Sequence, residues 1–583
     1  METVKIKINN REYTVEKGLT VLEAARSVGV KIPTLCYLKD YTGTGACRVC
    51  MVEVKGARSL CAACVYPVSE GMEVFTHSKK AVDARRETVE LILSNHSKDC
   101  LTCVRNQSCE LQELAVAVGA RDIKYQGDYS TRVYDDASDG IVRDTSKCVL
   151  CGRCVEVCKK MQGLGVLGFQ DRGFKTTVGP VMQVSLKQVN CMQCGQCVNA
   201  CPVGALSEKE EIHKVMAALQ DPRKKVFIQT APAVRASLGE EFGMPIGTRV
   251  TGKMVAALKQ MGFYRVYDTN FGADLTIMEE GTEFINRVKN GGTLPMITSC
   301  SPGWIRYAER EYPDLLDNLS TCKSPHMMLG AMIKSYYAET NNIDPREIYN
   351  VSVMPCVAKK SEISRPEMMN GGYRNVDAVI TTRELGRLIK MFGIDLKDLP
   401  DDTFDQDVFG EYTGAGVIFG TSGGVMEAAL RTVYEVLTDE PCDDIDFTAV
   451  RGTEGLKEAS LTIDGLEVNV AVAHSMKIAK PLLDDIRAGK SKYHFIEIMG
   501  CEGGCVNGGG QSHISSLIKN SGVDYKALRA KALYEEDGVM PKRKSHENQQ
   551  VQDLYKNYLG QPCGHKSHEL LHTHYSKKER FDL

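Results

Sequence analysis

"CVLCGRCVEVC" at residues 148–158 and "CMQCGQCVNAC" at residues 191–201 decide how the first third of this chain folds, because both repeat the spacing C-x2-C-x2-C-x3-C. The chain has 23 cysteines among 583 residues. An odd number of cysteines in so long a chain does not suit the disulfide scaffolds of short secreted proteins. Thiols that fall in groups at short, regular spacing bind metal more often, and we interpret these two runs as metal-ligand sets.

The composition is that of an ordinary globular protein, with 43% hydrophobic and 25% charged residues and a mean hydropathy of −0.23. The net charge is −3 and no basic stripe stands out, so nucleic acid is not an expected partner. We see neither a secretory signal pattern nor an uninterrupted apolar run of about 20 residues. We therefore expect a cytoplasmic protein without a membrane span, built from two to four domains.

The doubled cysteine run is similar to that of the bacterial two-cluster ferredoxins, in which the fourth cysteine of each run ligates the other cluster. This resemblance assigns Cys148, Cys151, Cys154 and Cys201 to one [4Fe–4S] cluster. It assigns Cys191, Cys194, Cys197 and Cys158 to a neighbouring one.

A first cysteine group lies closer to the N-terminus, at Cys36, Cys47, Cys50 and Cys64. Residues 3–16 alternate around Asn9-Asn10 and predict a β-hairpin, and residues 20–29 predict a short helix. With this context the group resembles a plant-type [2Fe–2S] ferredoxin of the β-grasp fold, although its loop is longer than the plant pattern. A four-thiol zinc site is the alternative. Cys61 competes with Cys64 for the fourth place, and the "CVYPV" that starts at Cys64 favours Cys64.

The second group, "HSKDCLTCVRNQSC" at residues 96–109, offers three thiols and one imidazole, at His96, Cys100, Cys103 and Cys109. A lone histidine is usually a satisfied polar residue, but here three thiols lack a fourth ligand. We interpret the set as a [4Fe–4S] cluster with one histidine ligand. Exchanging a thiolate for neutral imidazole removes negative charge and should raise the reduction potential.

Beyond about residue 210 the pattern changes to apolar, strand-like runs between helical segments, and we expect an α/β domain. The runs are "KKVFIQTA" (224–231), "TLPMITS" (293–299), "NVSVMP" (350–355) and "YHFIEIMG" (493–500). We predict a multidomain α+β and α/β protein. Its four parts are a β-grasp [2Fe–2S] domain (1–80), a small His/Cys3 cluster domain (81–135), a two-cluster ferredoxin-like domain (136–210) and a large two-lobed α/β domain (211–583).

Three motifs in the last domain carry cysteines directly after predicted strands: "TSCSPGW" (298–304), "MPCVAKKSE" (354–362) and "MGCEGGCVNGGGQ" (499–511). A buried thiol acting as a small hydrophobic group accounts for Cys322, Cys442 and Cys563. It does not account for C-x3-C set among glycines. The three motifs resemble the signature sequences of [FeFe]-hydrogenases, and the likeness covers essentially the whole chain.

The resemblance implies an H-cluster, a [4Fe–4S] cube joined to a diiron unit that carries CO, cyanide and a dithiolate bridge with a central amine. By position, Cys505 bridges cube and diiron unit, while Cys356 and Cys501 hold the cube. Lys359 pairs with a cyanide. Met354 and Met499 line the diiron pocket, and "TAPAVR" from Thr230 covers another side.

The family usually has two adjacent cysteines where this chain has Cys300 and Ser301. In the family the first relays protons and the second ligates the cube. The interval from Ser301 to Cys356 matches the family's ligand-to-ligand interval. Either Cys300 is the relay and Ser301 or another group is the ligand, or Cys300 is the ligand after a local shift. Thiolate is the better ligand for iron, and oxygen ligation should lower the potential of the cube.

The same resemblance implies a proton path through Glu280, Glu283, Ser320 and Arg287 to Cys300. Glu280 and Glu283 lie three residues apart and share a helix face if the segment is helical. A solvated surface carboxylate is the ordinary alternative for either residue. A relay is preferred because a buried site that consumes protons needs one.

These residues together predict an [FeFe]-hydrogenase that catalyses 2H⁺ + 2e⁻ ⇌ H₂, fed by one [2Fe–2S] and three further [4Fe–4S] clusters. The chain has no G-x-G-x-x-G unit at a strand–helix junction, so flavin and nucleotide would sit on other subunits. We favour the catalytic subunit of an anaerobic, NAD(P)- and ferredoxin-linked, electron-bifurcating complex that depends on H-cluster maturation enzymes. The alternatives are a stand-alone ferredoxin-linked hydrogenase, a sensory hydrogenase, an iron–sulfur assembly protein, and a subunit of the NADH dehydrogenase large-subunit type.

Overall fold

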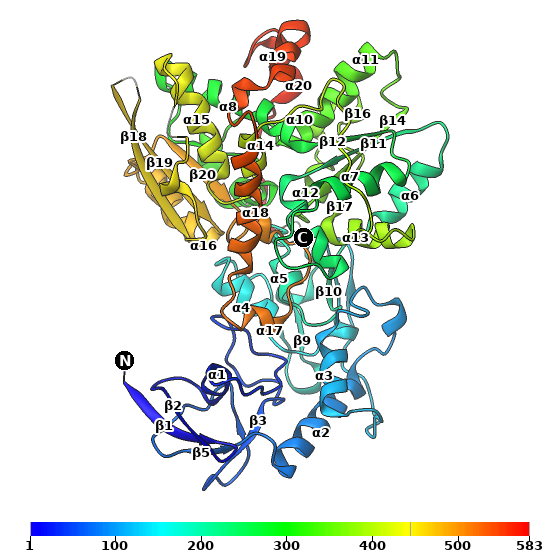
Figure 1. Ribbon diagram of the computed structural model, residues 1–583, viewed down its shortest axis with the longest axis vertical. Helices are drawn as coiled ribbons and strands as arrows, with labels where there is room; N and C mark the ends of the chain where they lie inside the picture. Colours follow the sequence, from blue (N-terminus) through cyan, green and yellow to red (C-terminus); the bar gives the residue numbers. More distant parts are fainter. Residues whose placement is uncertain (1, 443–444, 464, 582–583) are drawn as a thin grey trace. The chain divides into compact units, whose positions relative to one another are not determined.

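The computed structural model describes residues 2–442, 445–463 and 465–581, and it divides into two compact units. The first comprises residues 1–189, 197–207 and 514–523, and the second residues 190–196, 208–513 and 524–583. Figure 1 shows the elements of each. Among the described residues no helix combines the length and apolarity that a membrane crossing requires.

The first unit begins with a mixed five-stranded sheet in the order β2-β1-β5-β3-β4. Its strands are β1 (Thr3–Ile8), β2 (Arg11–Glu16), β3 (Met51–Val54), β4 (Cys61–Ala62) and β5 (Glu73–Phe75). The hairpin predicted over residues 3–16 is confirmed: β1 pairs antiparallel with β2, and Asn9 and Asn10 take the positive φ that a tight two-residue turn requires. The predicted helix is α1 (Val21–Ser27), which Thr20 and Glu23 cap reciprocally.

The rest of this unit consists of short elements joined by loops that carry the cysteines. The helices are α2 (Lys79–Asn95), α3 (Glu110–Val118) and α4 (Arg153–Lys160). The strands pair as two small antiparallel ladders, β6 (Tyr134–Asp135) with β7 (Ile141–Asp144) and β8 (Gly168–Gln170) with β9 (Thr177–Gly179). Because little of the chain is in regular elements here, the loops are free to wrap around bound groups.

The second unit contains two four-stranded sheets, and three of the predicted strand runs form strands of similar length. One sheet is parallel, in the order β12-β11-β14-β17, with β11 (Lys225–Thr230), β12 (Arg265–Asp268), β14 (Ile348–Met354) and β17 (Ala378–Thr381). The other has the order β13-β20-β19-β18, with β13 (Met296–Ile297), β18 (Leu456–Ile463), β19 (Leu466–His474) and β20 (Phe495–Met499). The run at 293–299 gives only the two residues of β13, since Pro295 has no N–H to continue a ladder.

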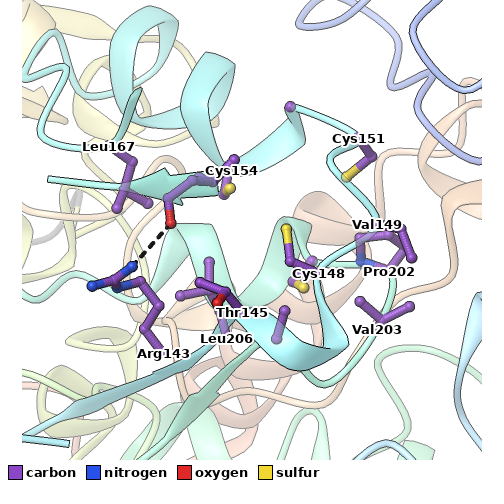
Figure 2. A pocket seen from close by; sticks show the side chains of 14 residues that line it. Arg143, Thr145, Cys148, Val149, Cys151, Cys154, Leu167, Pro202, Val203 and Leu206 are labelled. Carbon is purple, nitrogen blue, oxygen red and sulfur yellow. Dashed lines mark hydrogen bonds between the residues drawn. The ribbon is translucent and has the colours of Figure 1, made fainter. Parts of the chain in front are cut away.

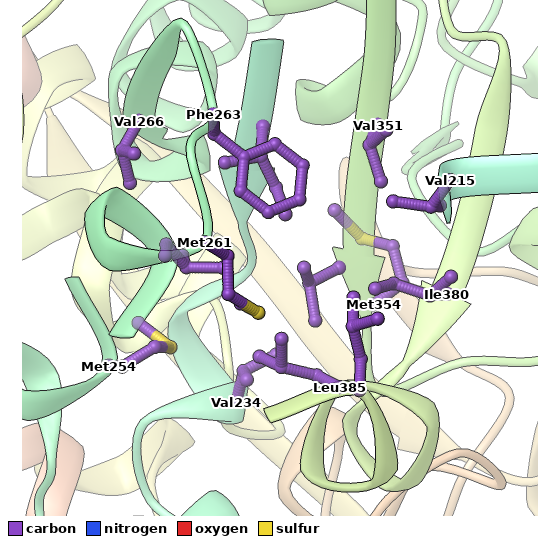
Figure 3. Close-up of a cluster of buried hydrophobic side chains, with 14 of the residues drawn as sticks. Val215, Val234, Met254, Met261, Phe263, Val266, Val351, Met354, Ile380 and Leu385 are labelled. Carbon is purple, nitrogen blue, oxygen red and sulfur yellow. The ribbon is translucent and has the colours of Figure 1, made fainter. Parts of the chain in front are cut away.

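Helix α8 (Thr269–Asn290) packs against both sheets of the second unit. Its Phe271 lies in a buried cluster with Phe227 of β11, and its Ile277 lies in another with Val470 of β19. The sheet that contains β11 packs its other side chains into a large aliphatic core (Figure 3), in which Met354 at the end of β14 lies close to Ile380 and Leu385. The long helix α8 therefore packs both sheets into one rigid frame.

Further helices surround these sheets. The longer ones are α6 (Ile212–Gln220), α7 (Thr251–Gln260), α9 (Pro302–Glu311), α10 (Pro325–Met332), α13 (Thr382–Met391), α15 (Gly424–Thr438), α16 (Met476–Arg487), α18 (Tyr525–Val539) and α20 (His565–Leu571). Helix α6 begins just after the domain boundary predicted at residue 210.

Candidate functional site

The three cysteine motifs of the second unit follow the carboxyl ends of parallel strands. Strand β14 ends at Met354, two residues before Cys356, and β20 ends at Met499, two residues before Cys501. Strand β13 ends at Ile297, three residues before Cys300. Strands β13 and β20 pair in parallel in one sheet, whereas β14 belongs to the other. The three motifs therefore leave the carboxyl ends of two sheets, which is where α/β folds form their sites.

The thiols of Cys356, Cys501 and Cys505 lie close to one another in a buried space. Burial raises the pKa of each thiol, and the negative charge of Cys356 raises the pKa of the other two further. Three such thiols are costly to ionise without a cation, and a metal reverses that preference by taking the thiolates as ligands. The donor set therefore fits an iron–sulfur cube better than a set of structural cysteines.

The glycine run after Cys505 lets two other loops approach this space closely. A Cβ at Gly508 would lie 2.1 Å from the Pro355 oxygen, and one at Gly509 would lie 2.3 Å from the Cys194 oxygen. The Cys501 thiol itself donates to the Cys194 carbonyl at 3.9 Å. The second cysteine of the 191–201 run thus touches the site directly.

Cys300 and Ser301 have different neighbours. Cys300 packs against the hydrophobic cluster that contains Met499, and burial and the charge of Glu280 raise the pKa of its thiol. Ser301 is the N-cap residue of α9, but its hydroxyl does not cap that helix. Its Oγ would lie 3.2 Å from a Cβ on Gly500, directly before Cys501.

Lys359 lies between the Cys300 segment and a buried acid. Its Nζ donates to the Cys300 carbonyl at 3.0 Å and to Oε2 of Glu362 at 2.8 Å. The same Glu362 oxygen lies 2.7 Å from Nε2 of His326. This histidine was missed in the sequence, since a lone histidine in an apolar stretch has no spacing signal.

The predicted proton-path residues form one continuous chain. Glu280 is fully buried, bonds to Ser320, and has its pKa raised to about 8 by burial and by Glu283. Ser320 Oγ donates to Glu283 Oε2 at 3.0 Å, and Arg287 Nη2 donates to Glu283 Oε1 at 2.6 Å. This hydrogen-bonded series of side chains runs from Glu280, a neighbour of Cys300, to the half-buried Arg287.

In the first unit, the predicted [2Fe–2S] thiols form one contact group. The side chain of Cys36 forms thiol hydrogen bonds with Cys47 and Cys64, and Cys64 also forms one with Cys50. Cys61 instead donates to the carbonyl of Ser59 at 3.7 Å, outside this group. The geometry therefore suits Cys64 better than Cys61 as the fourth ligand.

The predicted histidine-containing set lines one cavity, formed in part by His96, Cys100, Cys103 and Cys109. Within the part of the chain that the structure describes, Nδ1 of the buried His96 has no hydrogen-bond partner. A Cβ at Gly204 would lie 2.6 Å from the Cys103 sulfur, so only glycine admits the thiol there. An unpartnered buried nitrogen beside three thiols fits a bound metal group.

A second cavity of the first unit is lined by Cys148, Cys151, Cys154 and Cys201 (Figure 2). Its other walls are mostly apolar, and the Leu150 N–H donates to the Cys148 sulfur at 3.4 Å. Four thiols in an apolar space with N–H groups aimed at sulfur suit a [4Fe–4S] cluster.

The remaining set gives local signs of ligation. The Cys191 sulfur accepts a hydrogen bond from the Gln193 N–H at 3.4 Å. Burial raises the pKa of the Cys158 thiol, and hydrogen bonds from backbone N–H groups between Gly165 and Leu167 partly offset that rise. That Cys158, Cys191, Cys194 and Cys197 share one cluster stays a prediction from their spacing.

Comparison with known proteins accounts for the whole chain. Residues 224–509 match the family "Iron only hydrogenase large subunit, C-terminal domain", and residues 523–578 match "Iron hydrogenase small subunit". The chain is 46% identical to the NADP-reducing hydrogenase subunit HndD of Solidesulfovibrio fructosivorans, over 100% of both chains. This chain belongs to the [FeFe]-hydrogenases.

The hydrogenase is also 42% identical to iron hydrogenase 1 of Clostridium pasteurianum, over 98% of this chain and 100% of that protein. Among solved structures it resembles the [FeFe]-hydrogenase HydA1 of Chlamydomonas reinhardtii, with 42% identity and a TM-score of 0.56 over 63% of this chain and 99% of that one.

Its N-terminal part matches three further families. They are the "2Fe-2S iron-sulfur cluster binding domain" (1–79), the "NADH-ubiquinone oxidoreductase-G iron-sulfur binding region" (85–124) and the "4Fe-4S dicluster domain" (147–205). The prediction of a hydrogenase with an H-cluster domain and N-terminal [2Fe–2S] and [4Fe–4S] domains is confirmed.

Proposed function

We propose that this hydrogenase interconverts protons and H₂ at an H-cluster whose cube is held by Cys356, Cys501 and Cys505. The observation that carries the proposal is the meeting of these buried thiols at the ends of β14 and β20. When bound, the H-cluster supplies the diiron centre at which protons and electrons combine to form H₂. The chain supplies ligands, protons, electrons and exclusion of water.

Ser301 takes the remaining position at the cube, and Cys300 serves as the proton relay. Support comes from the neighbours of the two side chains. The Ser301 hydroxyl lies beside Gly500 and does not cap its helix. The charge of Glu280, by contrast, raises the pKa of the Cys300 thiol. An iron-bound serine must lose its proton, and its hard oxygen stabilises the oxidised cube more than a thiolate does.

Protons reach Cys300 through Arg287, Glu283, Ser320 and Glu280. Glu280 keeps its proton up to about pH 8, so it is a donor at neutral pH and is regenerated through Ser320. Burial also keeps the Cys300 thiol protonated, which lets it hand a proton inward and take the next from Glu280.

Lys359 holds its ammonium against the Cys300 carbonyl and Glu362, and we assign it to pairing with a cyanide of the cofactor. Met354 and Met499, both buried at strand ends, supply apolar walls beside it. Two of the walls are therefore apolar side chains that exclude water.

Electrons arrive through the N-terminal clusters, of which we propose one [2Fe–2S] and three [4Fe–4S]. At about 59 mV per pH unit, the proton couple lies near −0.4 V at neutral pH. Plant-type ferredoxin clusters lie near about −400 mV. Because the two potentials match, the enzyme runs in both directions.

Infrared spectroscopy of anaerobically matured protein tests the site. We expect bands of CO and cyanide in the wild type and their loss in Cys505→Ala. A matured wild type without these bands would overturn the assignment. In Cys300→Ala, an intact cube with no turnover supports the relay role, whereas loss of the cube makes Cys300 the ligand.

For the electron partner, we propose NAD(P)-binding subunits that carry flavin and iron–sulfur clusters, in a bifurcating complex with ferredoxin. The similarity to a protein named as a subunit of an NADP-reducing hydrogenase supports this. Anaerobic purification of the native protein tests it. A single polypeptide with full ferredoxin-linked activity would contradict the complex.

A further inference from the structure

A cysteine and two histidines near the C-terminal end meet beside α8. One ligand atom from each of Cys563, His568 and His572 lies within 4.8 Å of the others. His568 is exposed, Cys563 is half-buried and His572 is buried, so the group runs from the surface inward. None of the three takes part in the site described above.

His572 is held in the orientation that metal-binding histidines commonly have. Its Nδ1 lies 2.7 Å from the hydroxyl of Thr321, which leaves Nε2 facing the group. A hydrogen bond to the other ring nitrogen is what orients histidine ligands in known metal sites. His568, one turn earlier, places its ring 4.1 Å from that of His572.

The carboxylate of Glu279 lies beside this group and contacts two of its residues. Glu279 Oε2 lies 3.0 Å from Nε2 of His572 and accepts from the Cys563 N–H at 2.6 Å. Its other oxygen accepts from the Tyr555 hydroxyl at 2.6 Å, which holds the carboxylate in place. Cys563 itself has φ of 55°, a left-handed conformation that is uncommon for a residue with a side chain.

We propose that Cys563, His568, His572 and Glu279 form a binding site for one zinc ion, separate from the iron–sulfur clusters. One thiolate, two imidazoles and a carboxylate are the donors that Zn²⁺ takes in tetrahedral sites. With Zn–N near 2.0 Å and Zn–S near 2.3 Å, the donors must close in by about 1 Å. The open side at His568 allows this movement.

Zinc binding displaces the thiol proton of Cys563 to solvent. The proton between His572 Nε2 and Glu279 moves to Nδ1 of the same neutral ring, where the Thr321 hydroxyl accepts it, and two metal bonds replace the hydrogen bond between His572 and Glu279. Without the ion, burial and the charge of Glu279 raise the pKa of the Cys563 thiol, so the empty site is neutral at sulfur. No electron transfer is involved.

The site is coupled to the proposed proton chain. His572 also lies within 4.8 Å of Glu283 and Cys322, and the N–H of Thr321 donates to Glu283. An ion that pulls His572 outward changes how Glu283 is held. Bound zinc therefore slows turnover while the clusters stay intact.

The test uses the matured full-length protein, loaded with its iron–sulfur clusters and freed of adventitious metal. Zinc sulfate is added anaerobically, bound zinc and iron are counted by mass spectrometry, and zinc-edge X-ray absorption identifies the ligands. We expect one zinc per chain with one sulfur neighbour. Cys563→Ser and His568→Ala each weaken binding, measured by chelator competition, by about 100-fold or more.

His565→Ala, at an exposed histidine on the same helix, is the matched control and keeps wild-type affinity. Zinc inhibition of H₂ evolution follows the same order among the variants. Absence of bound zinc in the wild type overturns the proposal. So does zinc without a sulfur ligand, and so does zinc retained by both variants, which would place it at Glu283, Cys322 and His572.

Discussion

Glu280 carries the clearest physical signature in the proton chain, because burial lifts its pKa from 4.5 to about 8. Between those values the folded protein holds a proton that the unfolded chain has lost. The free energy of unfolding therefore falls as pH rises through this window. Burying the Glu280 carboxyl group costs stability. Its role as a neutral proton donor explains that burial better than packing does.

Glu280→Gln should lower H₂ evolution from reduced methyl viologen by roughly 10²–10⁴-fold, the usual contribution of a positioned acid. It should also flatten the fall of the thermal unfolding midpoint between pH 5 and 8. Asp274→Asn is the control on the same helix. Its buried carboxylate bonds to Thr413 and Asn548, so this change should cost stability with little effect on turnover per folded molecule. Full activity in Glu280→Gln would remove this residue from the path.

Ser301→Cys should raise the reduction potential of the cube, because a softer thiolate replaces oxygen at the same position. The measurement is an EPR-monitored redox titration of protein made without maturation enzymes, so that the cube is observed alone. Gly500→Ser, which crowds the same space, should impair cube assembly. An unchanged potential in Ser301→Cys would show that residue 301 does not ligate iron.

At the scale of elements, the site is a meeting of loops at strand ends rather than a property of any one strand. The loop after β20 packs against the loop after β14. The residues of the glycine run fit at these contacts because they have no side chain. These two loops can approach each other because α8 packs against both sheets.

Gly509→Ala tests this close approach. The new Cβ would meet backbone atoms of Cys194 and Gly195, which cannot rotate away, so we expect a loss of about 1–3 kcal/mol and a perturbed cube spectrum. Gly538→Ala, at a helical position of α18 with open space around it, should be neutral or slightly stabilising. Calorimetry and EPR compare the two variants. Equal stability in both would show that the loops can separate freely.

At the scale of the whole molecule, the chain joins cluster-binding domains to a hydrogenase domain. Turnover depends on the whole relay only when the electron donor reduces the [2Fe–2S] cluster. Small dyes that reduce inner clusters directly should bypass the first one.

Cys47→Ser should therefore remove the [2Fe–2S] signal and abolish turnover with the protein partner, while dye-linked turnover persists. Cys61→Ser, whose sulfur lies outside the thiol group, should leave both activities unchanged. Parallel assays with dye and with the co-purified partner check this. Equal loss in both assays would mean that the change disturbs folding instead.

Much of this architecture was predictable because iron–sulfur ligation constrains local spacing. The doubled C-x2-C-x2-C-x3-C run, the hairpin around Asn9-Asn10 and the motif "MGCEGGCVNGGGQ" carry their signals within a few residues. Cys563 was different, since it resembled a small buried hydrophobic group until its distance to His572 was known.

The sequence by itself determined the cofactor classes, the strand runs and the family, since each depends on contacts between residues that are near in the chain. Only the tertiary structure decided which way Cys300 and Ser301 face and what lies beside His572. It also decided how far burial raises the pKa of Glu280. Those properties arise from side chains distant in sequence that packing brings into one low-dielectric space, where the energy of a charge depends on every neighbour.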